Sequence, residues 1–183
     1  LGLGSGIEAG VAAMPHGGVT MNSAFLRPRS RGTVRLANGD PTAAPLIDPN
    51  YWDDPYDREM SIRGLKLAQE VMRRNALKPF VMAERLPGPD VRTDDDYFNY
   101  ACRNAKTDHH PAGTCRMGID TKAVVAPDLT FNGIEGLRVA DASIMPTLVS
   151  ANTNATAIMI GEKAADLILG RNGDSPKQES PMT

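Results

Sequence analysis

The chain has 183 residues, of which 41% are hydrophobic and 23% are charged, and its formal net charge is −2. This composition is typical of a soluble globular protein with one domain, or with one domain and a fragment of another. Because the net charge is small and the basic residues are scattered, neither nucleic acid nor an anionic membrane is favoured as a partner.

The chain begins with the stretch LGLGSGIEAG, in which Gly4, Gly6 and Ala9 match the glycine-rich turn of dinucleotide-binding folds. That turn needs a buried strand before it and a helix after it. No strand can precede Leu1, and Pro15 leaves no room for a helix of useful length. We therefore interpret the stretch as a loop of small residues, in a chain that begins inside a longer protein.

A small antiparallel sheet and a helix are expected next. Residues 22–26 and 32–36 are short extended runs, and Asn38 with the glycine after it supplies a turn. Asp54 is a capping residue, a proline follows it, and apolar residues then recur at helical spacing to Arg74. This pattern predicts a helix from Asp54 to Arg74.

Two more helices and one strand are predicted further along the chain. A threonine followed by three aspartates predicts a second helix over residues 93–106. Residues 137–140 form an apolar run typical of a strand, and a long helix is expected over residues 154–169, ended by Gly170. Since apolar residues cover most faces of that last helix, we expect it to be buried on more than one side.

The residues able to do chemistry gather after position 100. Cys102, His109, His110 and Cys115 are competent zinc ligands. Their spacing matches neither of the usual paired-ligand patterns, and adjacent histidines in an extended chain point apart. We therefore expect no metal site.

A histidine acting as acid or base is the best use of this loop. An imidazole with its ordinary pKa of about 6.5 exchanges protons at neutral pH. Pro111 stiffens the backbone next to His110, and Gly113 allows a ligand to approach the main chain closely. Nucleophilic catalysis is poorly supported, because the chain has no G-x-S-x-G motif and Cys115 has no evident activation.

Three long motifs resemble one known family. They are HPAGTCRMG, GLRVADASIMPTLVSANTNATAIMIGEKAADLI and LRPRSRGTVRLANGDPTAAPLIDPNYWDDPYD. The first two resemble the C-terminal signature of the glucose-methanol-choline (GMC) flavoprotein oxidoreductases, and the third resembles the start of their substrate-binding portion. The resemblance covers residues 15–170.

The resemblance implies roles for individual residues. His110 falls at the catalytic histidine of the family, and Asn152 falls at a second catalytic position that is histidine or asparagine in different members. The cofactor implied is FAD, with contacts expected from Asp141, Ala142, Asn152 and Thr153. The alternative for Asp141 is a carboxylate that only forms a turn.

The resemblance also implies a domain organisation. Residues 1–110 are expected to form an α+β substrate-binding portion with a mostly antiparallel sheet. Residues 111–170 are expected to supply the catalytic loop and a strand and helix that complete an α/β FAD-binding domain. Residues 171–183 are a polar tail that we expect to be mobile.

The function implied is oxidation of the CH–OH group of an alcohol to an aldehyde or ketone, by hydride transfer to FAD. The partners implied are a small alcohol, an N-terminal FAD-binding half absent from this sequence, and oxygen or a quinone as electron acceptor. A flavin-containing enzyme similar to hydroxynitrile lyases and a non-catalytic binding fragment are the alternatives.

The cellular compartment follows from what the sequence lacks. Two cysteines are too few for a disulfide framework, which favours a reducing compartment. The chain has no run of 18 apolar residues and no secretory signal at its start. We expect a cytoplasmic protein without a transmembrane segment, and peripheral membrane association stays open.

Overall fold

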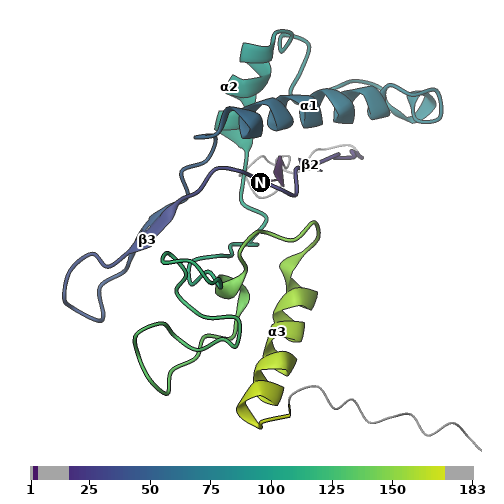
Figure 1. Cartoon of the computed structure of the whole chain (residues 1–183). Helices are drawn as coiled ribbons and strands as arrows, with labels where there is room; N and C mark the ends of the chain where they lie inside the picture. Colours follow the sequence, from purple (N-terminus) through teal and green to yellow (C-terminus); the bar gives the residue numbers. More distant parts are fainter. Residues whose placement is uncertain (1, 4–16, 172–183) are drawn as a thin grey trace, which may run out of the picture. The chain divides into compact units, whose positions relative to one another are not determined.

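The computed structural model describes residues 2–3 and 17–171 (Figure 1). Residues 4–9 of the glycine-rich stretch and the tail at residues 172–183 lie outside the described residues, so what the sequence indicates about them stays a prediction. The loop predicted for the opening stretch is wrong at Gly2–Leu3, which form a short strand. The chain divides into two compact units, Leu1–His109 and His110–Thr183. None of the helices in the described ranges has the length and apolar character that a bilayer span requires.

Nine elements follow one another in the described residues. They are β1 (Gly2–Leu3), β2 (Ser23–Ala24), β3 (Thr33–Arg35), β4 (Leu46–Asp48), α1 (Pro55–Met72), the 3-10 helix η1 (Lys78–Phe80), α2 (Asp94–Asn104), the 3-10 helix η2 (Ala142–Ile144) and α3 (Thr153–Ile168). The first seven belong to the first unit and the last two to the second.

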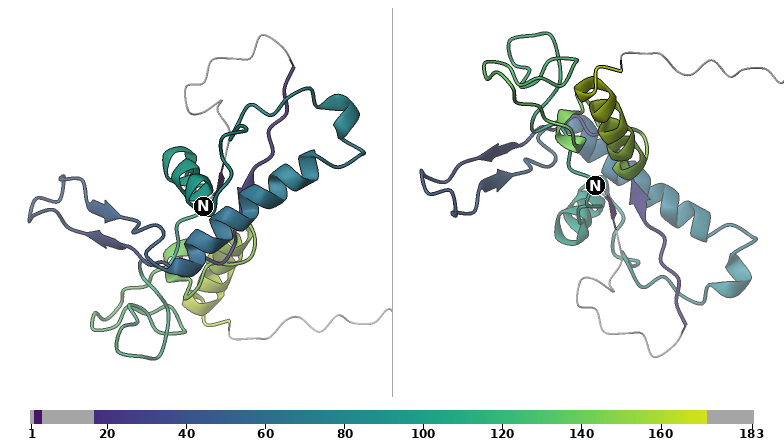
Figure 2. Two further views of the ribbon diagram at one scale, coloured as in Figure 1. Left: turned by 90° about the horizontal axis from the view of Figure 1, so that it is seen from above. Right: turned by 90° about the horizontal axis from the view of Figure 1, so that it is seen from below.

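The strands of the first unit form two short antiparallel ribbons. One ribbon pairs β1 with β2, and the other pairs β3 with β4 so that Val34 lies opposite Ile47. Asn38 makes the predicted turn after β3, because its side-chain oxygen accepts a hydrogen bond from the Asp40 amide at 2.8 Å. Antiparallel strands with helices agree with the predicted α+β class (Figure 2).

Helix α1 begins where the sequence predicts. The Asp54 carboxylate accepts a hydrogen bond from the Tyr56 amide at 2.8 Å, and a proline occupies the first turn. In the same turn the buried Asp57 accepts hydrogen bonds from the backbone amides of Arg29 and Ser30, both at 2.8 Å. The start of α1 therefore anchors the segment that leads into β3.

Helix α2 begins with a complete capping box. The Asp96 amide donates to the Thr93 hydroxyl at 3.2 Å, and the Thr93 amide donates back to the Asp96 carboxylate at 2.8 Å. The backbone bond from Thr93 and then its hydroxyl lower the pKa of Asp96 below the ordinary value. The helix ends at Asn104, short of the predicted residue 106, because Ala105 is extended with ψ of 145°.

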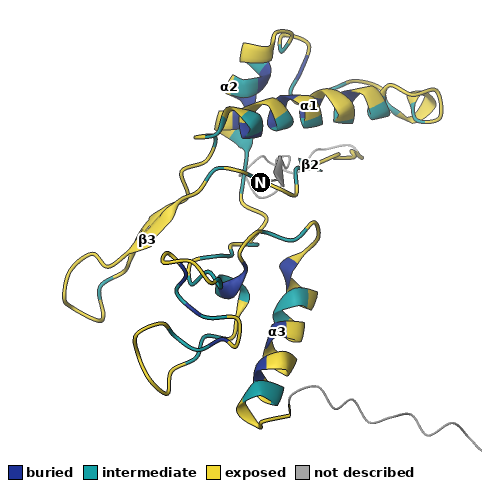
Figure 3. Cartoon of the chain, viewed as in Figure 1, coloured by how far each residue is buried: buried dark blue, intermediate teal, exposed yellow. Residues whose placement is uncertain are grey.

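The core of the first unit lies between α1 and α2, where both helices turn their buried faces toward each other (Figure 3). Its buried residues are Ile62, Leu65, Tyr97, Tyr100 and Ala101. Trp52 packs edge-on against Phe98, with ring centroids 5.5 Å apart. Burial, and then the charge of Glu84, raise the pKa of Tyr100.

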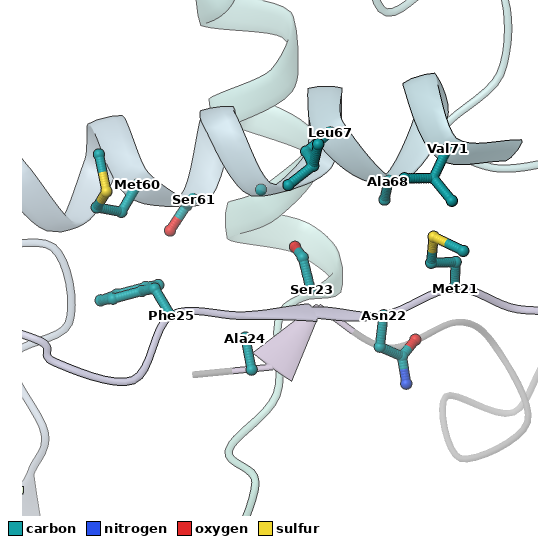
Figure 4. Close-up of a pocket in the computed structure, with 11 residues that line it drawn as sticks. Met21, Asn22, Ser23, Ala24, Phe25, Met60, Ser61, Leu67, Ala68 and Val71 are labelled. Atoms are coloured by element: carbon teal, nitrogen blue, oxygen red, sulfur yellow. The ribbon is translucent and has the colours of Figure 1, made fainter. Parts of the chain in front are cut away.

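An apolar groove of about 360 Å³ runs between α1 and residues 21–25 (Figure 4). The two segments approach most closely at Gly64, where an added Cβ would lie 2.7 Å from the Ser23 hydroxyl oxygen. The groove is lined by Met21, Asn22, Ser23, Ala24, Phe25, Met60, Ser61, Gly64, Leu67, Ala68 and Val71. No acidic, basic or thiol side chain is among these described residues, so the groove has no group for proton transfer.

The second unit is built around α3 and a series of loops. Its buried core consists of Val125, Leu129, Ile144, Met145, Ile160 and Ala164. The predicted strand at residues 137–140 is wrong as a regular strand within the described residues, because only a single antiparallel bridge joins Thr130 to Arg138. One bridge is too short for a ladder, so the segment is extended without being part of a sheet.

Helix α3 spans Thr153–Ile168 and is followed by Gly170 at φ of 68°, the left-handed ending that the sequence predicts. The sequence predicted that this helix would be buried on more than one side, and this is not observed within the described residues. Ile160 and Ala164 are buried, whereas Ile158 and Ile168 are 60% and 66% exposed. The second unit covers only the face of α3 that meets its own loops.

Candidate active site

The loop that carries His110 is fixed by backbone hydrogen bonds to η2. The bonds run from Gly113 to Ala142, from Cys115 to Ser143 and from Met117 to Ile144, with N–O distances of 3.4, 2.9 and 2.8 Å. Gly113 has φ of 88°, and a Cβ there would lie 3.2 Å from the Met145 carbonyl oxygen. A side chain would be strained at this positive φ, and the close approach observed here is between two parts of the chain. The approach of a ligand to Gly113 stays a prediction.

Asp141 and Ala142 form the start of η2. The exposed Asp141 carboxylate accepts a hydrogen bond from the Ser143 amide at 2.7 Å, which caps the short helix. The Ala142 carbonyl accepts the bond from Gly113. Asp141 thus has the turn-forming role that was its alternative interpretation, and the contact of Asp141 and Ala142 with a cofactor stays a prediction.

His110 is held by the first residue of α3. Its Nδ1 atom lies 3.0 Å from the hydroxyl oxygen of Thr153, in a hydrogen bond that joins residues 43 positions apart. Thr153 is buried with 8% of its surface exposed, and His110 is half-buried. Within the part of the chain that the structure describes, Nε2 of His110 has no hydrogen-bond partner. The imidazole is therefore anchored at one ring nitrogen, and the other is available for proton transfer.

Asn152 is the exposed capping residue of α3, and it differs from the usual cap. Its side chain makes no capping hydrogen bond, and the first turn contains no acidic residue. In the described ranges, no hydrogen bond joins the Asn152 amide to His110 or to any other residue. The amide is free to bind a ligand, and its catalytic role stays a prediction.

His109 and the two cysteines lie apart from this arrangement. His109 is exposed with φ of 59°, and its backbone amide donates to the Thr107 hydroxyl at 3.1 Å. Cys102 and Cys115 are both free thiols. Among the described residues, no three His, Cys, Asp or Glu side chains are grouped as metal ligands would be.

An ion pair closes the loop after the His110 motif. Arg116 donates two hydrogen bonds to the Asp120 carboxylate, at 2.9 and 2.7 Å. The guanidinium holds the pKa of Asp120 well below its usual range, and the bond raises the pKa of Arg116. The pair fixes the turn that leads from the His110 loop into the core, a role that the sequence analysis missed.

The sequence analysis placed Thr153 near the cofactor and did not connect it with His110. A contact between residues 43 positions apart, from a loop to a helix start, leaves no periodic signal in one sequence. The available signal was a hydroxyl residue at the first helical position, directly after a capping asparagine.

The comparisons with known proteins agree on one family. The family model described as GMC oxidoreductase matches residues 28–161, which is most of the chain. The chain is therefore a member of the GMC oxidoreductase family.

Two curated relatives are named for alcohol oxidation. The chain is 43% identical over 152 residues to an alcohol dehydrogenase [acceptor] of Pseudomonas putida, covering 83% of this chain and 28% of the relative. It is 42% identical over 164 residues to an oxygen-dependent choline dehydrogenase of Rhizobium rhizogenes, covering 88% of this chain and 30% of the relative. The chain thus spans less than a third of the length of these relatives.

Solved structures of similar fold include two oxidoreductases. Pyridoxine 4-oxidase from Mesorbium loti superposes with a TM-score of 0.76 at 34% identity, over 81% of this chain and 29% of that one. An FAD-dependent oxidoreductase from Chaetomium thermophilum superposes with a TM-score of 0.76 at 30% identity, over 84% of this chain and 27% of that one. The fold of this chain is thus similar to one part of these enzymes.

Proposed function

We propose that this chain is the C-terminal part of an FAD-dependent enzyme that oxidises the CH–OH group of an alcohol to an aldehyde or ketone. The observation that carries the proposal is the His110 side chain, which Thr153 holds at the start of α3 and whose Nε2 is open within the described residues. This arrangement lies within the segment that matches the GMC family.

His110 acts as the base. Neutral imidazole accepts the hydroxyl proton of the alcohol at Nε2, which makes the departure of hydride from the same carbon favourable. Since Nδ1 is bound to Thr153, the ring can present Nε2 in one orientation rather than rotate freely. His110 therefore both takes the proton and sets the direction from which the alcohol approaches.

Asn152 binds the alcohol oxygen. Its amide can donate a hydrogen bond without a change of charge near neutral pH, so proton transfer is left to His110. The amide makes no capping bond to α3, and no other described residue occupies it. Asn152 can therefore hold the oxygen through the reaction.

The residues present fit FAD. Within the described residues, the first turn of α3 has no side-chain cap and no acidic residue, so its backbone amides and partial positive charge suit the negative charge that develops on a flavin as it is reduced. Residues 152–153 and 141–142 would hold the cofactor. FAD, when bound, supplies the acceptor for the hydride that leaves the alcohol carbon.

Helix α3 would also complete the FAD-binding domain. Its exposed apolar side chains include Ile158, Met159 and Ile168, which are 60%, 55% and 66% exposed. A face of this kind is normally covered by other structure, and the chain spans less than a third of its relatives. We propose that this face contacts an N-terminal FAD-binding portion.

The proposed electron acceptor is oxygen or a quinone. The proposed location is the cytoplasm.

The alternatives are less well supported. The two curated relatives above are named as dehydrogenases, and neither is named as a lyase. A hydroxynitrile lyase-like reaction would leave the flavin oxidised under anaerobic alcohol, whereas the proposed reaction bleaches it. A non-catalytic fragment would give a natural gene product without bound flavin.

The test is substitution of His110 in the flavin-loaded protein that contains this sequence. His110→Ala removes the imidazole, and we expect the rate of anaerobic flavin reduction by an alcohol to fall by about 1000-fold, while flavin content is unchanged. His109→Ala is the matched control, since the neighbouring histidine is exposed and its hydrogen bond to Thr107 is made by its backbone amide. Reduction by the His110→Ala protein within a few fold of the natural rate would refute the proposal.

A further inference from the structure

The hydroxyl group of Thr153 makes a hydrogen bond outside its own helix. In α2 the threonine hydroxyl belongs to the capping residue Thr93, which precedes the helix and accepts a hydrogen bond from a backbone amide of the first turn. Thr153 instead directs its hydroxyl oxygen to Nδ1 of His110, at 3.0 Å. The hydroxyl is therefore committed to a ring nitrogen rather than to the helix.

The pair is shielded from solvent on the threonine side. Thr153 has 8% of its surface exposed, and no other described residue makes a hydrogen bond to Nδ1 of His110. Water has little access to replace the hydroxyl, so the protonation state of Nδ1 is coupled to the threonine.

The direction of this hydrogen bond follows from the role proposed for Nε2 as the base, because a hydroxyl can pair with either tautomer of a neutral imidazole. When His110 is protonated, both ring nitrogens carry hydrogen, and the Thr153 oxygen can only accept from Nδ1. When His110 is neutral, the same bond persists if Nδ1 keeps its hydrogen, and Nε2 then has the free lone pair. The other tautomer would require the hydroxyl to rotate and donate, and it would leave Nε2 protonated and unable to act as a base.

We infer that Thr153 is a positioning residue that fixes His110 in the tautomer protonated at Nδ1, so that Nε2 is the basic nitrogen. The inference rests on the proposed function of His110 and adds a second role to the start of α3. The hydroxyl proton of the alcohol passes to Nε2, the Nδ1 hydrogen stays on the bond to Thr153, and no rearrangement accompanies the transfer. In this role the Thr153 hydroxyl acts on the reaction through His110, separately from the cofactor contact proposed for residues 152–153.

Two variants of similar size separate the hydroxyl from the shape of the side chain. Thr153→Val keeps the branched shape and removes the acceptor, and Thr153→Ser keeps the acceptor and removes a methyl group. In long-range ¹⁵N–¹H spectra of the flavin-loaded protein, the imidazole pattern of His110 is assigned by its loss in His110→Ala.

For the natural protein we expect a neutral His110 with hydrogen on Nδ1, and for Thr153→Ser the same. For Thr153→Val we expect a mixture of tautomers or the opposite one. In the flavin-loaded protein the limiting rate of anaerobic reduction by alcohol falls about tenfold in Thr153→Val and recovers in Thr153→Ser, with little change in the alcohol concentration for half-maximal rate. A purely structural role would not move the tautomer.

The failures of the two proposals are distinguishable. If His110→Ala reduces flavin at the natural rate, the proposed function fails, and the tautomer spectra of the Thr153 variants still decide the hydrogen-bond assignment. If His110→Ala is inactive but Thr153→Val keeps the Nδ1 hydrogen and the natural rate, the positioning role of Thr153 is refuted. Circular dichroism of Thr153→Val that matches the natural protein excludes misfolding as the cause.

Discussion

The three α-helices begin in two different ways. The first turns of α1 and α2 are closed by their own sequence, with Asp54 capping one and the box of Thr93 and Asp96 capping the other. Both turns also carry acidic residues. The first turn of α3 has neither a side-chain cap nor an acid within the described residues, and its threonine hydroxyl is bound to His110.

The difference shows which helix starts have their first-turn amides capped by nearby side chains and which does not. A closed helix start satisfies backbone amides and stabilises the fold, as the Asp54 cap does for α1. In the same turn Asp57 binds the backbone amides of residues 29 and 30. An open start leaves amides and partial positive charge available for a ligand. In this family member the open start is the one next to the proposed catalytic histidine.

Among changes to the helix starts, the largest expected effect comes from closing the start of α3. Asn152→Asp places a carboxylate at the cap, where it accepts bonds from the first-turn amides and adds negative charge beside the proposed flavin site. We expect unfolding stability to rise by about 0.5–1 kcal/mol and the rate of anaerobic flavin reduction to fall about 100-fold. Thermal unfolding and stopped-flow absorbance measure the two effects.

Asn152→Ser is the neutral control for that experiment. Serine caps the helix without charge, so it is expected to stabilise the protein and to lose less of the reduction rate than aspartate. An Asn152→Asp protein that reduces flavin at the natural rate would show that charge at this helix start has no functional importance.

A moderate effect is expected when a closed start is opened. Asp54→Ala removes the bond to the Tyr56 amide and is expected to lower the free energy of unfolding by about 1 kcal/mol. Asn152→Ala removes a side chain with no capping bond, and it is expected to change the free energy by less than about 0.5 kcal/mol. Urea denaturation of the two variants makes the comparison, and equal losses would mean that Asn152 caps α3 in solution.

The smallest effect is a pH dependence at the start of α2. Because the hydrogen bonds from Thr93 lower the pKa of Asp96, the folded state is stabilised above the ordinary carboxyl pKa of about 4. This contribution is lost as the pH falls through the lowered pKa. Urea midpoints measured from about pH 6 to about pH 2 should therefore decline less steeply for Asp96→Asn than for the natural chain. Curves of identical slope would contradict the assignment of the capping box.

The parts of the fold that the sequence predicts are those with local signals. Asp54 and Thr93 mark the helix starts, and Gly170 marks the end of α3, because each effect depends on residues within one turn. The run at residues 137–140 is apolar, but a strand needs a partner from elsewhere in the chain, and a sequence pattern does not supply one.

In the candidate site, too, features with a sequence signal differ from features that depend on the packing of distant segments. The family motif points to His110 and Asn152 as site residues, and their roles stay predictions. It does not identify the bond between His110 and Thr153 or the capping bond of Asp141, since these depend on how distant segments pack. The role of each residue toward a flavin stays a prediction.

The bond between His110 and Thr153 makes the proposed catalytic unit a product of tertiary folding. The histidine lies at the beginning of the second unit and its partner at the first residue of the last helix, so neither segment contains the site alone. Docking of α3 depends on Ile160 and Ala164, which are buried in the core of this unit. We therefore expect a cavity made at Ile160 to slow the proposed reaction without altering any proposed reacting group, and the rate of anaerobic flavin reduction in such variants would report how firmly the helix is seated.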